Sequence, residues 1–264
     1  MNRLGSTLTI IFLCLVAFYF LVLRPEKYVE SDVYDSIMKR GFIRVGVNVD
    51  SKPFAFYDKT GELAGYDIDL AKYIAEHIMG SNKNIKFVPV TPSNRLMKIS
   101  TGDVDIVIAT MTITPQREKI INFSIPYDTA GQALLVRSTS EIKSISDLQG
   151  QNVGVIWGTT AEKNMVTLAP NAHVIGFKSY AEAYNALKKG KIEAITSDNT
   201  ILSRFTADDK QVIILPKRYS KEPYGIGFRK GKGSDKLKES LDNAILDLRQ
   251  KNVLTRIHKK WLND

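Results

Sequence analysis

The stretch "VDIVIATMTITPQR" at residues 104–117 begins as a buried β-strand and continues without a break into hydroxyls and a guanidinium. Ile106–Ala109 supply the apolar run of a covered strand, and Thr110, Thr112 and Arg117 follow it. Ligands of doubly wound sheets bind outside the carboxyl ends of the strands. The sequence therefore predicts that this strand delivers polar side chains to an anionic ligand.

Strand-like and helix-like segments alternate outward from this stretch in both directions, which is typical of an α/β protein with largely parallel sheets. We expect strands at 42–49, 85–90, 104–110, 131–138, 152–157, 172–177, 193–197, 211–215 and 224–231. We expect helices at 67–80, 93–101, 160–169, 179–190, 234–250 and 253–262, the first with Asp67 as its N-cap and Gly80 as its stop.

The order of these segments predicts two doubly wound sheets joined by a two-crossing hinge. Residues 35–133 form the first part of lobe 1, residues 134–219 form lobe 2, and residues 220–264 return to lobe 1. Two connections between two lobes make a hinge.

The N-terminal run "TLTIIFLCLVAFYFLVL" (7–23) is apolar and uncharged, with Arg3 before it. It is long for a secretory signal, at the lower limit for a membrane span, and followed by no small-residue cleavage site. We interpret residues 1–30 as an export signal that also anchors the chain, which places the remainder at the periplasmic or extracellular face of the membrane. Cys14, the only cysteine, lies in this run after bulky residues, which argues against lipidation.

The net charge of +9 over 264 residues raises nucleic acid as a partner. Acids interrupt the basic stretches, and no recognition module is present, so we expect a solvated basic surface and no nucleic-acid binding. The three histidines, His77, His173 and His258, are scattered without metal-ligand spacing, and no catalytic or nucleotide-binding motif occurs. We expect no cofactor and no metal.

Four polar clusters end the predicted strands, at 48–51, 110–114, 157–160 and 197–199, and they come from both lobes. They converge on one cleft. The predicted ligand-binding residues are Asn48, Ser51, Tyr66, Arg95, Thr110, Thr112, Arg117, Thr159, Thr160 and Asp198.

Each main candidate has a structural alternative. Arg117 offers a planar fork to a carboxylate, or it is a surface arginine that pairs with Glu118 or with the neighbouring lobe. Asp198 binds a ligand ammonium, or it caps the next helix. Tyr66 packs on aliphatic ligand carbons, or it is a core-edge aromatic.

Thr159 with Glu162 three residues later predicts a capping box. The same helix start, at Thr160, offers free N–H groups to an anion, and both functions can hold at once.

From residue 35 to 264 the chain resembles the family 3 solute-binding proteins of bacterial ABC importers. The resemblance rests on "IRVGVNVDSKPFAFYD", "GELAGYDIDLAKYIAE", "GDVDIVIATMTITPQREKIINFSIPY", "SISDLQGQNVGVIWGTT", "YGIGFRKG" and "KKWL", in this order. "VTPSNR" (90–95), "GQALLV" and "EKNMVTLAP" are most similar to binders of glutamate, glutamine and aspartate.

The resemblance implies that Arg117, Thr112 and the helix start at Thr160 hold the ligand α-carboxylate, and that Asp198 holds the α-ammonium. It implies that Arg95 reaches the ligand side chain. Acidic-ligand members often carry a lysine at the position of Asn48, so one cation is missing from this pocket, and glutamate, glutamine and aspartate stay open.

Cationic ligands are not expected, because the pocket positions supply no spare carboxylate beyond Asp50. The resemblance also implies the two-lobe periplasmic-binding-protein fold (type II). It further implies hinge closure over the ligand and delivery to a membrane permease, by a monomer that is not an enzyme. Two alternatives share the fold: an exported enzyme similar to cyclohexadienyl dehydratases, and a ligand-sensing domain.

Overall fold

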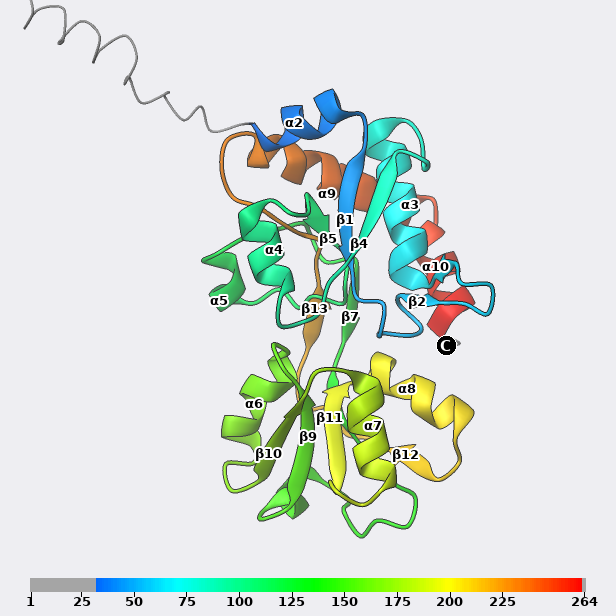
Figure 1. Cartoon of the computed structure of the whole chain (residues 1–264), viewed down its shortest axis with the longest axis vertical. Coiled ribbons are helices and arrows are strands. Elements are labelled where there is room, and N and C mark those ends of the chain that lie inside the picture. Colours follow the sequence, from blue (N-terminus) through cyan, green and yellow to red (C-terminus); the bar gives the residue numbers. More distant parts are fainter. Residues whose placement is uncertain (1–31, 263–264) are drawn as a thin grey trace, which may run out of the picture. The chain divides into compact units, whose positions relative to one another are not determined.

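The computed structural model describes residues 32–262, and the N-terminal run interpreted as a signal and anchor lies outside them. The described chain forms two lobes, each built on a five-stranded sheet (Figure 1). Among the described residues, no helix is both long enough and apolar enough to cross a membrane.

Lobe 1 takes its sheet from the first and last parts of the described chain, in the order β4-β1-β5-β14-β6. Its elements are α2 (Val33–Arg40), β1 (Ile43–Val47), the hairpin β2 (Phe56–Tyr57) and β3 (Leu63–Ala64), α3 (Tyr66–Met79), β4 (Ile85–Pro89), α4 (Arg95–Thr101), β5 (Ile106–Val107), α5 (Pro115–Glu118), β6 (Asn122–Phe123), β14 (Gly227–Phe228), α9 (Ser234–Gln250) and α10 (Val253–Leu262).

Lobe 2 has the sheet order β10-β9-β11-β8-β12. Its elements are β8 (Gln132–Arg137), the 3-10 helix η1 (Ile145–Leu148), β9 (Asn152–Ile156), α6 (Thr160–Leu168), β10 (His173–Phe177), α7 (Tyr180–Lys188), β11 (Ala194–Asp198), α8 (Asn199–Asp208) and β12 (Val212–Ile214).

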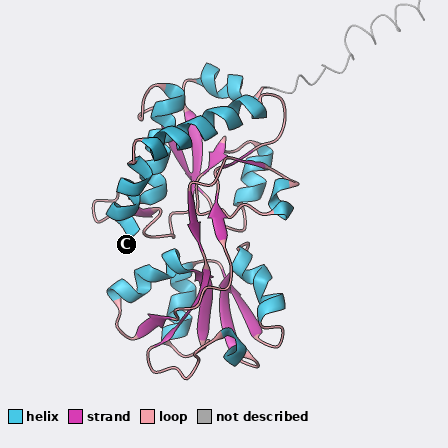
Figure 2. Ribbon diagram, turned by 180° about the vertical axis from the view of Figure 1, so that it is seen from behind, coloured by secondary structure: helices cyan, strands magenta, loops and turns pink. Residues whose placement is uncertain are grey.

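Two antiparallel strands, β7 (Asp128–Ala130) and β13 (Glu222–Tyr224), carry the chain from one sheet to the other and back. Figure 2 shows them side by side between the two sheets, as Figure 1 does. The predicted lobe boundaries at residues 134 and 220 stay predictions, but two paired crossings are what a two-crossing hinge requires.

The expectation of largely parallel sheets was wrong in one respect, because both sheets are mixed. The pairs β1–β4, β1–β5, β9–β10 and β9–β11 are parallel, whereas β8 and β14 pair antiparallel with their neighbours. The connectivity explains the difference: β8 and β14 each follow a crossing strand, so they enter a sheet at the edge where β1, β5, β9 and β11 end. A strand that enters at that edge must run against them.

Most predicted elements are present, with three corrections. The single strand predicted at 224–231 is two strands in different sheets, β13, which ends at Tyr224, and β14 at Gly227–Phe228. Helix α3 begins at Tyr66 with Gly65 as its N-cap, so the assignment of Asp67 as the cap was wrong. The strand predicted at 104–110 pairs only over β5, because the backbone at Thr110 turns into the left-handed region with φ of 46°.

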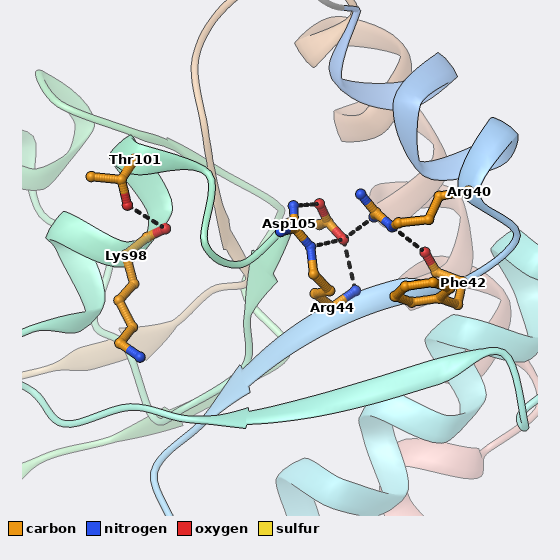
Figure 3. A network of polar contacts seen from close by, with 6 residues as sticks. All are labelled: Arg40, Phe42, Arg44, Lys98, Thr101 and Asp105. Carbon is orange, nitrogen blue, oxygen red and sulfur yellow. Dashed lines mark hydrogen bonds and ion pairs between the residues drawn. The ribbon is translucent and has the colours of Figure 1, made fainter.

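An ion-pair cluster ties the starting ends of β1 and β5 together, at the edge of the sheet opposite the strand ends (Figure 3). The Asp105 carboxylate, 7% exposed, accepts hydrogen bonds from Arg44 N at 2.7 Å and Arg44 Nη2 at 2.8 Å, and pairs with Arg40. The Arg40 Nε donates to the Phe42 carbonyl at 3.2 Å. The cluster therefore fixes β5 in register before it reaches the polar end of the strand.

We predict that Asp105→Ala lowers the free energy of unfolding by about 2–3 kcal/mol, since it leaves two arginines and a buried backbone N–H without their shared acceptor. Urea unfolding measures this loss. Asp103→Ala, which removes an exposed acid two residues earlier, is the matched control and should change the free energy by less than about 0.5 kcal/mol.

Candidate functional site

A buried turn at Thr110, just beyond β5, explains why a core strand continues into polar residues. Thr110 is β-branched and yet has φ of 46°, a conformation that such residues rarely adopt. Its backbone N–H donates to Asp67 Oδ2 and to the Tyr127 hydroxyl, both at 3.2 Å, and the Tyr127 hydroxyl donates to Asp67 Oδ1 at 3.1 Å. This buried group holds the turn that sends Thr112 and Arg117 away from the sheet.

Arg117 lies in the short helix α5, whose N-cap Thr114 accepts a hydrogen bond from Arg117 N. Its guanidinium is buried, at 4% exposure, and donates to the carbonyls of Thr112 at 2.7 Å and Gly158 at 3.1 Å. The alternative of a surface pair with Glu118 was therefore wrong. Burial, and then the neighbouring Arg95 cation, lowers the pKa of Arg117 to about 9.

The bond from Arg117 to Gly158 joins the two lobes. Gly158 ends the loop between β9 and α6 with φ of 82°, and a Cβ there would lie 2.5 Å from the Pro92 carbonyl oxygen in lobe 1. Only glycine allows this approach of the two backbones. Arg117 thus reaches the N-terminus of α6, where free N–H groups favour an anion.

The capping box predicted at this helix start forms in a modified way. Thr159, the N-cap, accepts from Glu162 N at 3.3 Å, as expected, and its hydroxyl donates to the Ile156 carbonyl at 2.7 Å. The Glu162 carboxylate, however, accepts from Gly158 N at 2.7 Å instead of from Thr159 N. The Thr160 hydroxyl donates to Glu222 at 2.9 Å.

Asp198 stands at the N-cap position of α8 but makes no side-chain capping bond. Its carboxylate, 7% exposed, instead accepts from the Tyr224 hydroxyl at 2.5 Å. Burial first, and then the neighbouring Glu222, raise the pKa of Asp198 to about 7, although the Tyr224 hydrogen bond, Arg95 and Arg117 oppose the shift. The capping alternative was wrong, and Asp198 and Arg117 lie close enough for their charges to interact.

Arg95 is the first residue of α4 and is 3% exposed. Its Nη1 donates to the Ala109 carbonyl at 2.5 Å, just before the turn at Thr110, while its buried Nε has no hydrogen-bond partner. Burial lowers the pKa of Arg95, and Tyr180, Tyr127 and Asp198 oppose the shift. A buried donor without an acceptor is costly, so this N–H points to a ligand acceptor.

Asn48 and Ser51 lie together just beyond the end of β1, and both are buried. Much of their polar capacity is used locally: the Ser51 hydroxyl donates to the Asn48 carbonyl at 2.5 Å, and Asn48 Oδ1 accepts from Asp50 N at 3.4 Å. The Asn48 amide N–H₂ is the group that the structure leaves for a ligand.

Tyr66 is packed into the hydrophobic core. Its ring is 1% exposed and packs at 5.6 Å from the Phe54 ring, 6.1 Å from Tyr127 and 6.2 Å from His258, measured between centroids. These contacts favour the core-aromatic alternative.

The fold also buries several polar residues near these side chains that no sequence pattern had marked as ligand-binding, namely Asp67, Tyr127, Gln132, Tyr180, Glu222 and Tyr224. The statement that no carboxylate is available beyond Asp50 was wrong, because Glu222, 3% exposed, lies on β13 against Thr160 and accepts from the Ser220 hydroxyl at 2.6 Å. No local pattern marks Glu222, which stands in a basic stretch. Asp67 had a signal, but helix capping explained it equally well.

The described residues contain no group of three or more His, Cys, Asp or Glu side chains that could hold a metal ion. The arrangement instead presents two buried guanidiniums, three buried carboxyl groups, a helix N-terminus and neutral hydroxyls from both lobes. These groups can hold a small zwitterion.

Comparison with known proteins agrees with this chemistry. Residues 43–264 match the model of the bacterial extracellular solute-binding proteins, family 3. The chain belongs to this family. As a family 3 protein it is 37% identical to the ABC transporter glutamine-binding protein of Bacillus subtilis (strain 168), over 90% of this chain and 88% of the relative.

A glutamine-binding protein of Geobacillus stearothermophilus is 40% identical, over 78% of this chain and 79% of the relative. Among solved structures, an ancestral amino acid-binding protein described as a precursor of cyclohexadienyl dehydratase superposes with a TM-score of 0.80 at 35% identity, covering 87% of this chain and 99% of that one. The chain is thus similar to binding proteins, one of which precedes an enzyme.

We predict that Tyr127→Phe lowers the free energy of unfolding by about 1–3 kcal/mol, because it removes the buried hydroxyl that donates to Asp67 Oδ1 and accepts from Thr110 N. Chemical unfolding measures this change, and Tyr73→Phe on the exposed face of α3 is the control. Equal stability of both variants would show that the Tyr127 hydroxyl does not hold the turn at Thr110.

Proposed function

We propose that this chain binds a polar amino acid outside the cytoplasmic membrane, glutamine before glutamate or aspartate, and delivers it to the permease of an ABC importer. One observation carries the proposal. Arg117 of lobe 1 and Asp198 of lobe 2 are buried side chains of opposite charge, and they lie close enough for their charges to interact. An α-amino acid carries the complementary pair of charges on one carbon atom.

Arg117 binds the α-carboxylate with its planar fork, together with Thr112 and the N–H groups at the start of α6 near Thr160. In the structure this guanidinium donates only to neutral carbonyl oxygens, and the ligand carboxylate adds a negatively charged acceptor. Asp198 binds the α-ammonium, supported from behind by the Tyr224 hydroxyl. Thr110 and Thr159 support these contacts through the backbone turns that they form.

The side-chain end of the ligand meets Arg95, whose Nε donates to a carbonyl or carboxylate oxygen, and the amide of Asn48 beside Ser51. The charges favour a neutral side chain, because the two buried guanidiniums already share the site with three buried carboxyl groups, those of Asp67, Asp198 and Glu222. Glutamine adds no net charge to this buried set, whereas glutamate adds one negative charge. Two relatives described as glutamine-binding proteins support the same choice.

Binding proceeds by closure of the lobes around β7 and β13, with the hinge at the boundaries near residues 134 and 220. The proposed cleft draws ligand contacts from both lobes, so a bound amino acid favours the closed arrangement. The permease then recognises the closed form. We propose a monomer that uses no cofactor and binds no nucleic acid.

We also propose that residues 7–23 remain as an anchor. A tether keeps the binding domain near the permease and raises its effective concentration there.

The second candidate is an exported enzyme similar to cyclohexadienyl dehydratases. One observation favours it: a buried carboxyl with a pKa of about 7, as at Asp198, is partly protonated at neutral pH, which a general acid requires. Turnover of prephenate or arogenate by the purified protein would support this candidate. Against it, the direct partner of Asp198 is a tyrosine hydroxyl that fits an ammonium clamp.

We predict that glutamine at a hundred times its Kd raises the thermal midpoint by about 5–10 °C, since a ligand that binds only the native state adds about 2.7 kcal/mol to stability. All twenty amino acids are compared. Arg117→Ala should abolish the shift, and Arg117→Lys, which keeps the charge but loses the fork, should weaken binding at least tenfold. If no amino acid shifts the folded protein, this function is excluded.

We predict that the affinity rises with pH between about 6 and 8. Asp198 must be ionised to pair with the ammonium, and its pKa is about 7 before binding. A ligand ammonium lowers that pKa, so binding releases a proton below pH 7 and the Kd falls as pH rises through this range. Calorimetry in buffers of different ionisation enthalpy measures the proton release, and Asp198→Asn should bind weakly with no pH dependence from this group.

A further inference from the structure

Asp50 stands in lobe 1, two residues beyond the buried Asn48, and its side chain reaches into lobe 2. Its Oδ2 accepts a hydrogen bond from the backbone N–H of Tyr180 at 2.6 Å. Tyr180 is the first residue of the nine-residue helix α7, where a backbone N–H has no partner within the helix. Asp50 therefore supplies a helix-terminal acceptor to the opposite lobe.

A second element of lobe 2 holds the same residue. Arg204, on α8, donates from Nη1 to the Asp50 carbonyl at 3.0 Å and lies 3.9 Å from Asp50 Oδ1. The side chains of Arg204 and Asp50 are 20% and 33% exposed, so this contact is only partly open to water. Two helices of lobe 2 thus converge on one residue of lobe 1.

We propose that Asp50 is a latch between the lobes: a positioning residue that stabilises the closed arrangement and sets how long a ligand stays bound. The ligand part of this inference rests on the proposed function, but the latch itself consists only of protein atoms. Both contacts require α7 and α8 to lie against the end of β1. When the lobes separate, the Tyr180 N–H and the Arg204 guanidinium lose these partners, while the ligand groups around Arg117 and Asp198 stay on their own elements.

As a latch, the Asp50 carboxylate has a role that no sequence pattern indicated. Asp50 lies near the binding residues in sequence, and it was the acid considered for a cationic ligand side chain. The N-terminus of α7 favours a negative charge by its dipole, and Arg204 adds a cation. With these partners, the Asp50 carboxylate serves the contact between the lobes instead of the ligand.

The test compares Asp50→Ala with Asp208→Ala in the purified full chain. Asp208 also faces lobe 1, at 3.8 Å from Lys52, but it is 74% exposed and contributes no helix cap, so its loss should have little effect. Hydrogen exchange at the Tyr180 amide, followed by NMR without ligand, reports the latch directly. Stopped-flow binding of glutamine gives the association and dissociation rates.

We expect Asp50→Ala to speed exchange at the Tyr180 amide and to raise the ligand dissociation rate about five- to tenfold, the effect of losing one helix cap and a charged partner. Association should change less than about threefold, since most interface changes act on dissociation. Asp208→Ala should leave all three quantities within about twofold of the wild type. If Asp50→Ala does not fold, Arg204→Gln tests the other half of the latch and should raise dissociation in the same direction.

Unchanged Tyr180 exchange and unchanged dissociation in Asp50→Ala would overturn the latch. Loss of binding with unchanged Tyr180 exchange would also overturn it and make Asp50 a ligand-contacting residue. If the wild type binds none of the amino acids, the proposed function fails, whereas the exchange experiment still decides whether Asp50 holds the lobes together.

Discussion

The burial of positive charge at Arg117 and Arg95 is the constraint on which the rest of this structure depends. A guanidinium removed from water needs acceptors, and at these two positions the backbone provides them: the carbonyls of Thr112, Gly158 and Ala109. These carbonyls accept from part of each guanidinium, whereas the buried Arg95 Nε has no hydrogen-bond partner. This N–H is therefore a donor left for the proposed ligand, and burial lowers the pKa of both arginines.

Those carbonyls are available because the chain leaves regular structure where the strands end. Thr110 turns into the left-handed region directly after the Ala109 carbonyl that Arg95 uses, and Asp67 and Tyr127 hold this turn. In lobe 2 the turn falls at Gly158, whose carbonyl Arg117 uses and where a side chain would strike Pro92. Only the turn at Thr110, a β-branched residue with positive φ, is strained, and strain of this kind is typical of functional sites.

Tyrosine hydroxyls connect the charged groups to the scaffold. Tyr224 on the returning crossing strand donates to Asp198 of lobe 2, and Tyr180 of α7 lies within hydrogen-bond distance of Ser197, at 3.0 Å. Tyr224 also forms an isolated bridge with Thr112. Because Tyr224 belongs to the crossing between the lobes, the proposed ammonium clamp and the proposed hinge share one residue.

The sequence by itself determined the α/β class, the two-sheet order of elements, and the polar strand ends from which Arg117, Thr112 and Asp198 come, because hydrophobic period and strand ends are local properties. It could not choose between alternatives that look the same locally: Asp67 and Asp198 each stand where a helix cap belongs, and only their partners Tyr127 and Tyr224, 60 and 26 residues away, show that they do not cap. The sequence did not mark Glu222 and suggested Asp50 only as a ligand carboxylate, since their partners Thr160 and Tyr180 lie in the other lobe or across the hinge. The tertiary structure decided these roles, because the burial of a charge and the identity of its partner depend on which distant segments the fold brings together.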